Sequence, residues 1–199
     1  MKLKKKMPKI ILASKSKVRA DILKKNYIDF EVSPSNIDEE NIKIGLLYKG
    51  ATPELISKNL AELKANSVSL KFHDKIVLGA DSVIDLDGEL ISKPKSRDNA
   101  LQILKKLNGK KHFLISSVCI SKNGNMIWNY TDKSLLTMKF FPDKDLVDYL
   151  SKLPDDIIYA YNVYQIEGVG KTLFSNITGD KDSIMGLPIS KIKNYLEEI

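Results

Sequence analysis

The chain has 199 residues, 43% of them hydrophobic and 29% charged, which is the composition of a globular protein and excludes wholesale disorder or a fibrous repeat. The net charge is +7, from 32 basic and 25 acidic residues, but only Arg19 and Arg97 are arginines. Proteins that read nucleic acid usually enrich arginine, because its planar fork grips phosphate and guanine. We therefore expect no nucleic-acid partner, whereas a small polyanionic substrate is compatible with the charge.

The single cysteine, Cys119, excludes an internal disulfide, and two histidines are too few for a Cys/His metal cluster. A lone thiol suits a reducing compartment, so we expect a cytoplasmic protein. The longest apolar stretch, residues 113–120, contains two serines and falls far short of the ~20 residues that a membrane-spanning helix needs. No membrane partner is expected. Without repeats or a linker, residues 1–199 are expected to form one domain, with residues 1–8 as a flexible basic tail.

Strand and helix signals alternate along the chain, which predicts an α/β fold with a mixed sheet. Apolar or alternating runs predict strands at 10–12, 29–32, 75–78, 83–86, 89–92, 111–121, 125–140 and 172–177. Capping residues and helical periodicity predict helices at 16–25, from Thr52 onward, at 97–107, 143–152 and 189–199. The helix after Thr52 is expected to bury Ile56, Leu60, Leu63 and Ser67, with Lys64 on its flank. The dipeptides Asp87-Gly88 and Asn123-Gly124 mark the turns between paired strands.

Two polar clusters lie early in the chain. Ser14, Ser16 and Arg19 stand where a strand gives way to a helix, and free backbone N–H groups there make a ready anion site. The same residues also suit plain helix capping, with Arg19 on a solvated face. Acidic residues at 37–40 in a loop after a strand either bind a hard divalent cation or simply form a solvated loop.

Two further clusters follow. Asp81 is expected at the end of a buried strand, and the hairpin that turns at Asp87-Gly88 is expected to bring Lys93 back beside it. This pair is either a simple ion pair, or a metal ligand or general base next to a phosphate-binding cation. Glu167, in a glycine-rich segment, either sits in a turn or contacts a base or ribose.

The order and spacing of the motifs resemble the Maf family of nucleoside triphosphate pyrophosphatases over nearly the whole chain. Eight motifs in the same order argue against a chance match. The matching segments are Leu12-Ala-Ser-Lys-Ser-Lys-Val-Arg19, Ile37-Asp38-Glu39, Leu60-Ala-Glu-Leu-Lys-Ala65, Gly79-Ala-Asp-Ser82, Asp87-Gly-Glu with Lys93-Pro94, Leu107-Asn-Gly-Lys-Lys-His112, Tyr164-Gln-Ile-Glu-Gly-Val-Gly170 and Gly186-Leu-Pro188.

The resemblance implies an elongated, inosine triphosphatase-like α/β fold with a mixed twisted sheet, two lobes, a central cleft and often a homodimer. It implies metal-dependent hydrolysis of a nucleoside triphosphate to the monophosphate and pyrophosphate, which cleans the nucleotide pool. The substrate-binding residues it implies are Ser14, Ser16, Arg19, Ser82 and Glu167. The implied catalytic residues are Asp81 as proton acceptor, Glu39, Lys64 and Lys93, with Glu39 and Asp81 holding Mg²⁺ or Mn²⁺.

Departures from the family pattern bear on the base that is recognised. The pyrimidine-type members carry glutamine where this chain has Glu167, threonine at Ser82 and a second arginine at Val18. The branch similar to 7-methyl-GTP pyrophosphatases also has glutamate in the late motif, although it has glutamine at position 82. A glutamate can accept from a guanine-type N1–H and amino group, so we expect a modified or purine-like base. The alternative function is a non-catalytic, nucleotide-binding regulator of cell division on the same fold.

Overall fold

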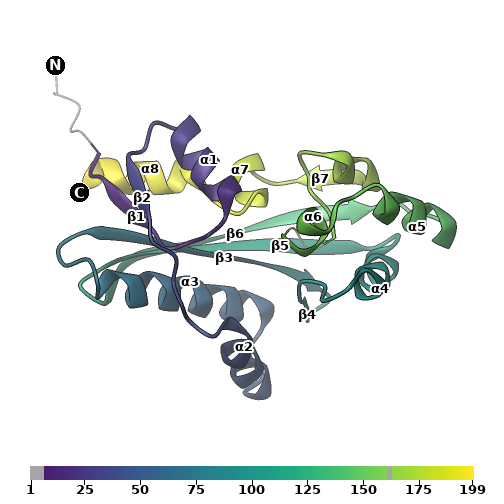
Figure 1. Ribbon diagram of the computed structural model, residues 1–199, viewed down its shortest axis with the longest axis horizontal. Coiled ribbons are helices and arrows are strands. Elements are labelled where there is room, and N and C mark those ends of the chain that lie inside the picture. The colour runs from purple at the N-terminus through teal and green to yellow at the C-terminus, as the bar shows by residue number, and fades with distance from the viewer. Residues whose placement is uncertain (1–6, 161–162) are drawn as a thin grey trace. The chain divides into compact units, whose positions relative to one another are not determined.

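The structure is a computed structural model that describes residues 7–160 and 163–199 (Figure 1). The chain forms two compact units. The first comprises Met1–Ser82, Ile115–Asp132 and Asp180–Ile199, and the second comprises Val83–Leu114 and Lys133–Gly179. Most of the expected basic tail at 1–8 lies outside the described residues, and the expected cleft stays a prediction.

The described strands form a mixed sheet in the order β2-β1-β3-β5-β6-β7, with β4 paired to β3. Strand β1 runs parallel to β2 and β3, whereas the β3/β4 and β6/β7 pairs are antiparallel, so the predicted mixed sheet is confirmed. The strands are β1 (Ile10–Leu12), β2 (Phe30–Val32), β3 (Ile76–Leu86), β4 (Glu89–Ile91), β5 (Lys111–Lys122), β6 (Asn125–Met138) and β7 (Phe174–Thr178).

All five predicted helices are confirmed. The described helices are α1 (Lys17–Lys25), α2 (Glu39–Tyr48), α3 (Pro53–Ser69), α4 (Arg97–Leu107), α5 (Asp143–Ser151), α6 (Asp155–Ala160), α7 (Lys181–Ile184) and α8 (Ile189–Glu198), with a short 3₁₀ helix at Val169–Leu173. The sequence did not predict α2, α6 or α7. Residues 37 and 38 lie in a loop as expected, but the expectation was wrong for Glu39 and Glu40, which begin α2. The Asp38 side chain accepts from the backbone N–H of Asn41 and caps this helix.

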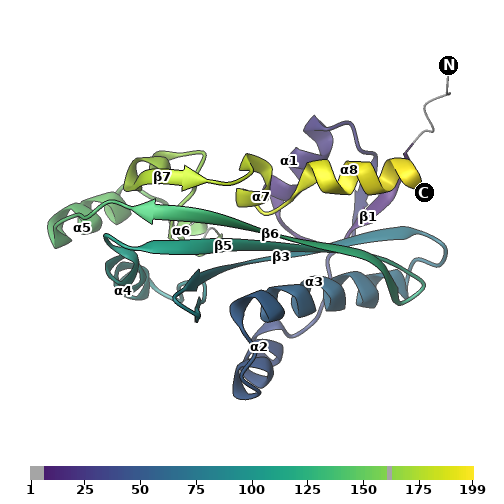
Figure 2. The same cartoon turned by 180° about the vertical axis from the view of Figure 1, so that it is seen from behind.

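In the first unit, α1 and α8 cover one face of the sheet and α3 covers the other (Figure 2). Alternate side chains of β3 therefore enter different layers. Leu78 and Ala80 pack in the α1/α8 layer with Ile22 and Ile192, whereas Val77 packs with Val68 of α3. Asp81 shares the face of Val77, and Ser82 shares the face of Ala80. Asp81 lies inside β3, so the expectation that it ends the strand was wrong.

The buried face of α3 differs from the expected one. Ile56 and Leu60 are fully buried as predicted, but Leu63 is 38% exposed and Lys64 is only 6% exposed. Positions 56, 60 and 64 follow one another at helical spacing, so the stripe that faces the sheet passes through Lys64 and leaves Leu63 outside. The burial of Lys64 is stabilised by the carboxylates that it contacts.

Strand β3 approaches α3 very closely at Gly79. A Cβ atom on Gly79 would lie 2.3 Å from the carbonyl oxygen of Ala61 and 2.6 Å from the backbone nitrogen of Ala65. No side chain fits in this space, so only glycine lets the helix and the strand meet at this distance.

In the second unit, the β3/β4 hairpin turns at Asp87-Gly88, with Ile84 opposite Ile91. Asp87 and Gly88 have φ values of 52° and 88°, the left-handed conformations that such a two-residue turn requires. The predicted hairpin is thus confirmed. The core of the second unit gathers apolar side chains from α4, α5 and β7: Ala100, Leu104, Leu107, Leu146, Leu150 and Phe174.

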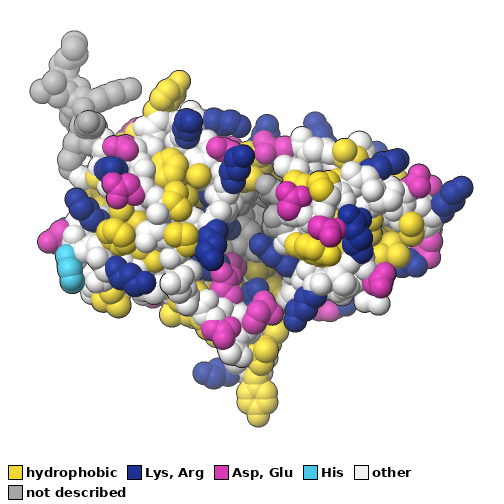
Figure 3. All heavy atoms as spheres, in the orientation of Figure 1, with side chains coloured by type: hydrophobic (Ala, Val, Ile, Leu, Met, Phe, Trp, Pro, Cys, Tyr) yellow, Lys and Arg dark blue, Asp and Glu magenta, His cyan; other side chains and the backbone are white. Residues whose placement is uncertain are grey.

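Lysine and arginine side chains are interspersed with acidic ones on the surface seen in Figure 3. Over the described part of the chain, no helix is both long enough and apolar enough to cross a membrane.

Candidate active site

The loop from β1 into α1 has the groups that bind an anion. The Ser14 hydroxyl accepts from the backbone N–H of Ser16 (3.2 Å) and from Nη1 of Arg19 (3.2 Å), so its own proton remains available to a ligand. Ser16 caps α1 by accepting from the backbone N–H of Arg19 at 3.3 Å. The N–H groups of Lys17 and Val18, in the first turn of α1, precede any intrahelical acceptor. The predicted capping by Ser16 is confirmed, but the expectation that capping would leave Arg19 on a solvated face was wrong, because its guanidinium is buried. The anion site stays a prediction, and capping leaves the N-terminus of α1 open to phosphate.

The Arg19 guanidinium is fastened to two other parts of the first unit, strand β3 and the turn between α7 and α8. Its Nη1 donates to the carbonyl of Ala80 (2.9 Å), its Nη2 to the hydroxyl of Ser82 (3.1 Å) and its Nε to the carbonyl of Gly186 (3.0 Å). Burial lowers the pKa of Arg19, while the charges of Asp81 and Glu39 act in the opposite direction. The four bonds that Arg19 makes, including that to Ser14, go to neutral oxygens. A phosphate would supply the negative charge that these partners lack.

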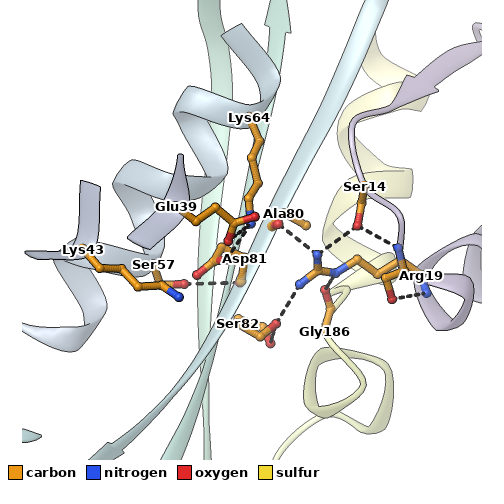
Figure 4. Close-up of polar contacts among 12 residues, drawn as sticks. Ser14, Arg19, Glu39, Lys43, Ser57, Lys64, Ala80, Asp81, Ser82 and Gly186 are labelled. Atoms are coloured by element: carbon orange, nitrogen blue, oxygen red, sulfur yellow. Dashed lines mark hydrogen bonds and ion pairs between the residues drawn. The ribbon is translucent and has the colours of Figure 1, made fainter. Parts of the chain in front are cut away.

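On the α3 side of β3, Lys64 lies between two carboxylates (Figure 4). Its Nζ is 2.8 Å from Oδ1 of Asp81 and 2.9 Å from Oε2 of Glu39. The side chains of Lys64 and Asp81 are 8% and 9% exposed, whereas that of Glu39 is 41% exposed. The hydroxyl of Ser57 donates to the backbone carbonyl of Asp81 (3.2 Å) and fastens α3 to this strand. The sequence-predicted residues Glu39, Lys64 and Asp81 thus meet at one place.

Asp81 has a buried oxygen, Oδ2, with no hydrogen-bond partner among the described residues. A buried carboxylate oxygen is costly to leave unpaired, which marks it as a place for a ligand or a proton. Within the described residues, no group of three or more His, Cys, Asp or Glu side chains is arranged to hold a metal ion. Asp81 and Glu39 nevertheless fit Mg²⁺ or Mn²⁺, since Mg²⁺ is usually held by one or two carboxylates together with substrate phosphates and water.

Two predicted site residues, Lys93 and Glu167, belong to the second unit. Lys93 is exposed and follows β4, and Glu167 is exposed in the segment before the 3₁₀ helix. That segment is compact, because a Cβ atom on Gly170 would lie 2.6 Å from the carbonyl oxygen of Gln165. The expected pairing of Lys93 with Asp81 stays a prediction.

Gly186 is a site residue whose role could not be read from the sequence, although the Gly186-Leu-Pro188 motif marked its place. Its φ is +97°, and a Cβ atom there would lie 3.0 Å from the Ser82 hydroxyl and 3.3 Å from Nε of Arg19. A side chain would therefore push against the guanidinium. The motif brings a backbone carbonyl, rather than a side chain, to the site.

The architecture is similar to that of a solved structure. A HAM1 protein from Coxiella burnetii has a TM-score of 0.55 at 11% sequence identity, and the match covers 97% of this chain and 100% of that one. This likeness concerns the fold alone and agrees with the expected inosine triphosphatase-like α/β architecture.

Sequence relatives define the family. Residues 9–199 match the family described as Maf-like protein, so the chain belongs to the Maf family. A nucleoside triphosphate pyrophosphatase from Pelagibacter ubique (strain HTCC1062) is 63% identical over 190 residues, which cover 96% of this chain and 97% of the relative. A 7-methyl-GTP pyrophosphatase from Bartonella quintana (strain Toulouse) is 39% identical over 180 residues, or 90% of each chain.

Proposed function

We propose that this protein is a nucleoside triphosphate pyrophosphatase that hydrolyses its substrate to the nucleoside monophosphate and pyrophosphate. The observation that carries the proposal is the buried Oδ2 of Asp81, which has no hydrogen-bond partner in the described part of the chain. Lys64 holds this carboxylate in place, in the same unit as the proposed phosphate-binding loop. The names of the relatives from Pelagibacter ubique and Bartonella quintana support this class of reaction.

In the proposed mechanism, Ser14, Ser16 and the N-terminus of α1 bind the triphosphate, and Arg19 directs its remaining N–H to the same phosphates. Lys64 fixes Asp81 through Oδ1, so that Oδ2 accepts a proton from the attacking water. Water attacks the α-phosphorus, the bond to the bridging oxygen breaks and pyrophosphate leaves. Lys93 neutralises charge on the leaving group. Positioning and charge stabilisation provide most of the rate enhancement.

Glu39 and Asp81 would hold Mg²⁺ or Mn²⁺ once the triphosphate contributes its own oxygens. A bound divalent ion would neutralise phosphate charge and lower the pKa of a bound water. The exposure of Glu39 suits this role, because its carboxylate can turn from Lys64 toward an incoming ion. The proposal extends to a cytoplasmic location, which the free, buried Cys119 supports, and to a homodimer, which the resemblance to the Maf family implies.

The proposed substrate has a modified or purine-like base that Glu167 recognises. A carboxylate accepts from the N1–H and amino group of guanine and favours the positive charge of a methylated base. The name of the Bartonella quintana relative supports this choice.

The test is pyrophosphate release from the standard nucleoside triphosphates, 7-methyl-GTP, pseudo-UTP and 5-methyl pyrimidine triphosphates, with Mg²⁺, Mn²⁺ or chelator. We expect metal-dependent release from a narrow subset that includes 7-methyl-GTP. Preference for dTTP and UTP would overturn the assignment of Glu167 and leave the enzyme class standing. Folded protein that binds nucleotide but releases no pyrophosphate would favour a non-catalytic regulator.

A further inference from the structure

Ser116 is a buried hydroxyl residue in β5 that none of the recognised motifs contains. It is 1% exposed and belongs to the first unit. Its hydroxyl donates to the backbone carbonyl of Ser183 at 2.7 Å and lies 3.1 Å from the hydroxyl of Ser82. Ser116, on β5, therefore joins β3 to α7.

The direction of the hydrogen bond between the Ser82 and Ser116 hydroxyl groups follows from the number of protons that each can donate. A carbonyl oxygen can only accept, so the single proton of Ser116 goes to Ser183. The proton between Ser82 and Ser116 must then come from Ser82. With its proton used, Ser82 faces Arg19 as an acceptor, which matches the bond that it receives from Nη2. Ser82 has no proton left for a substrate.

These hydrogen bonds form a closed ring that includes Arg19. From Arg19 the ring passes through Ser82 and Ser116 to the carbonyl of Ser183, and that carbonyl also accepts from the backbone N–H of Gly186 at 2.9 Å. The carbonyl of Gly186 in turn accepts from Nε of Arg19. Within residues 7–160 and 163–199, Ser14, Ala80 and the ring together occupy four of the five N–H groups of the guanidinium and leave one on Nη2.

We propose that Ser116 is a positioning residue: it fixes the Ser82 hydroxyl as an acceptor and so holds Arg19 with its remaining Nη2 hydrogen directed at the substrate's phosphate. This inference rests on the proposed function. It also assigns Ser82 a role that acts through Arg19, in place of a direct bond from its hydroxyl to the nucleotide. Without Ser116, the Ser82 proton loses its acceptor, and the hydroxyl is no longer held in the orientation in which it accepts from Nη2 of Arg19.

The test uses the Ser116→Ala variant, with Ser121→Ala as the matched control. Ser121 is also a buried hydroxyl of β5, but it donates to the side-chain oxygen of Asn66 at 2.6 Å, away from Arg19. The chain has only two arginines, so the ¹⁵N spectrum of arginine Nε–H groups contains one signal from Arg19 and an internal reference from Arg97. Arg97 is anchored separately, to Asp155 and the carbonyls of Leu150 and Leu153.

We expect Ser116→Ala to shift or broaden the Arg19 signal and to leave the Arg97 signal in place. The variant should lower kcat about tenfold, which corresponds to about 1.4 kcal/mol, and keep KM within about twofold of the wild-type value. Ser121→Ala should leave both signals and kcat unchanged. An unmoved Arg19 signal, or equal effects of the two variants, would overturn the proposal. If Ser116→Ala does not fold, the isosteric pair Ser116→Thr and Ser116→Val replaces it, and only the threonine should keep the wild-type signal.

The two proposals fail in different ways. If the wild-type protein releases no pyrophosphate from any triphosphate, the proposed function is lost, but the arginine spectrum still reports whether Ser116 orients Arg19. If release is normal and the Arg19 signal ignores Ser116, only the positioning role is lost.

Discussion

Lys64 shows how one buried side chain connects the stability of the first unit with its chemistry. A buried cation is costly unless opposite charges accompany it, and here two carboxylates from different elements lie within 3 Å of its Nζ. Lys64 in turn separates Glu39 from Asp81, which would otherwise repel each other. The three groups are therefore expected to behave as one electrostatic unit.

Replacing Lys64 by methionine should lower the free energy of unfolding by about 3 kcal/mol at pH 7, because Asp81 would remain as a buried, unpaired charge. Urea unfolding measures this. The control is Lys58→Met on the same helix, which removes a half-exposed pair with Glu54 (2.7 Å) and should cost less than about 1 kcal/mol. Equal losses in the two variants would show that the Lys64 pair is worth no more than a surface pair.

His112 gives the second unit a pH-dependent stability. Its Nε2 lies 2.8 Å from the hydroxyl of Tyr164, its ring contacts Phe174, and burial lowers its pKa from 6.5 to about 4. The unfolded chain holds the His112 proton more tightly than the folded chain does. The contribution of the neutral ring to the free energy of unfolding is therefore fully present above pH 6.5 and is lost as the pH falls toward 4. Because one pKa unit corresponds to about 1.4 kcal/mol, full protonation of His112 would lower the free energy of unfolding by about 3 kcal/mol.

The corresponding prediction is that His112→Gln flattens the pH dependence of the unfolding free energy between pH 6.5 and 4. Unfolding in urea at several pH values measures it. His73, the other histidine, is exposed, so His73→Gln should leave the wild-type slope in place. An unchanged slope in His112→Gln would contradict the account of the buried neutral ring.

At the scale of elements, the contact between α3 and β3 holds Lys64 against Asp81. Gly79→Ala would place a methyl group against the backbone of Ala61 and Ala65, so the helix must move. We expect a loss of about 2 kcal/mol of unfolding free energy, typical of overpacking, together with slower pyrophosphate release. Gly45→Ala in α2 is the control. Among the described residues, no atom outside its chain neighbours and the nearby backbone of α2 lies within 4 Å of the added methyl group, and alanine should stabilise the helix by about 0.5 kcal/mol. Similar results for both variants would contradict this view of the α3–β3 contact.

The elements that the sequence predicted correctly are those with local causes. The hairpin at Asp87-Gly88 follows from residues that tolerate positive φ, and α1 and α3 follow from the caps Ser16 and Thr52. Helix α2 was missed because it buries no residue and so has no clear apolar stripe. The burial of Lys64 could not be predicted either, because it depends on Asp81 and Glu39, which lie far away in the sequence.

The candidate site was predicted in part for the same reason. Motif order identified Arg19 and Asp81, but it could not show that most of the Arg19 donors bind backbone and hydroxyl oxygens. Ser116 gave no signal, because a serine in an apolar strand looks like ordinary packing. Only the fold brings it to Ser82.

At the scale of the whole molecule, the proposed machinery is divided between the two units. The phosphate loop and the Glu39–Lys64–Asp81 group belong to the first, whereas Lys93 and Glu167 belong to the second. The net charge of +7 favours the approach of a polyanionic nucleotide. Hydrolysis at the α-phosphorus is the central part of the proposed function.

The most direct test is hydrolysis in ¹⁸O-labelled water, with the products separated and weighed by mass spectrometry. Attack at the α-phosphorus predicts one ¹⁸O atom in the nucleoside monophosphate and none in pyrophosphate. Asp81→Asn, with the fold retained, should release neither product at a measurable rate. Label in pyrophosphate, or in orthophosphate alongside a nucleoside diphosphate, would contradict the account.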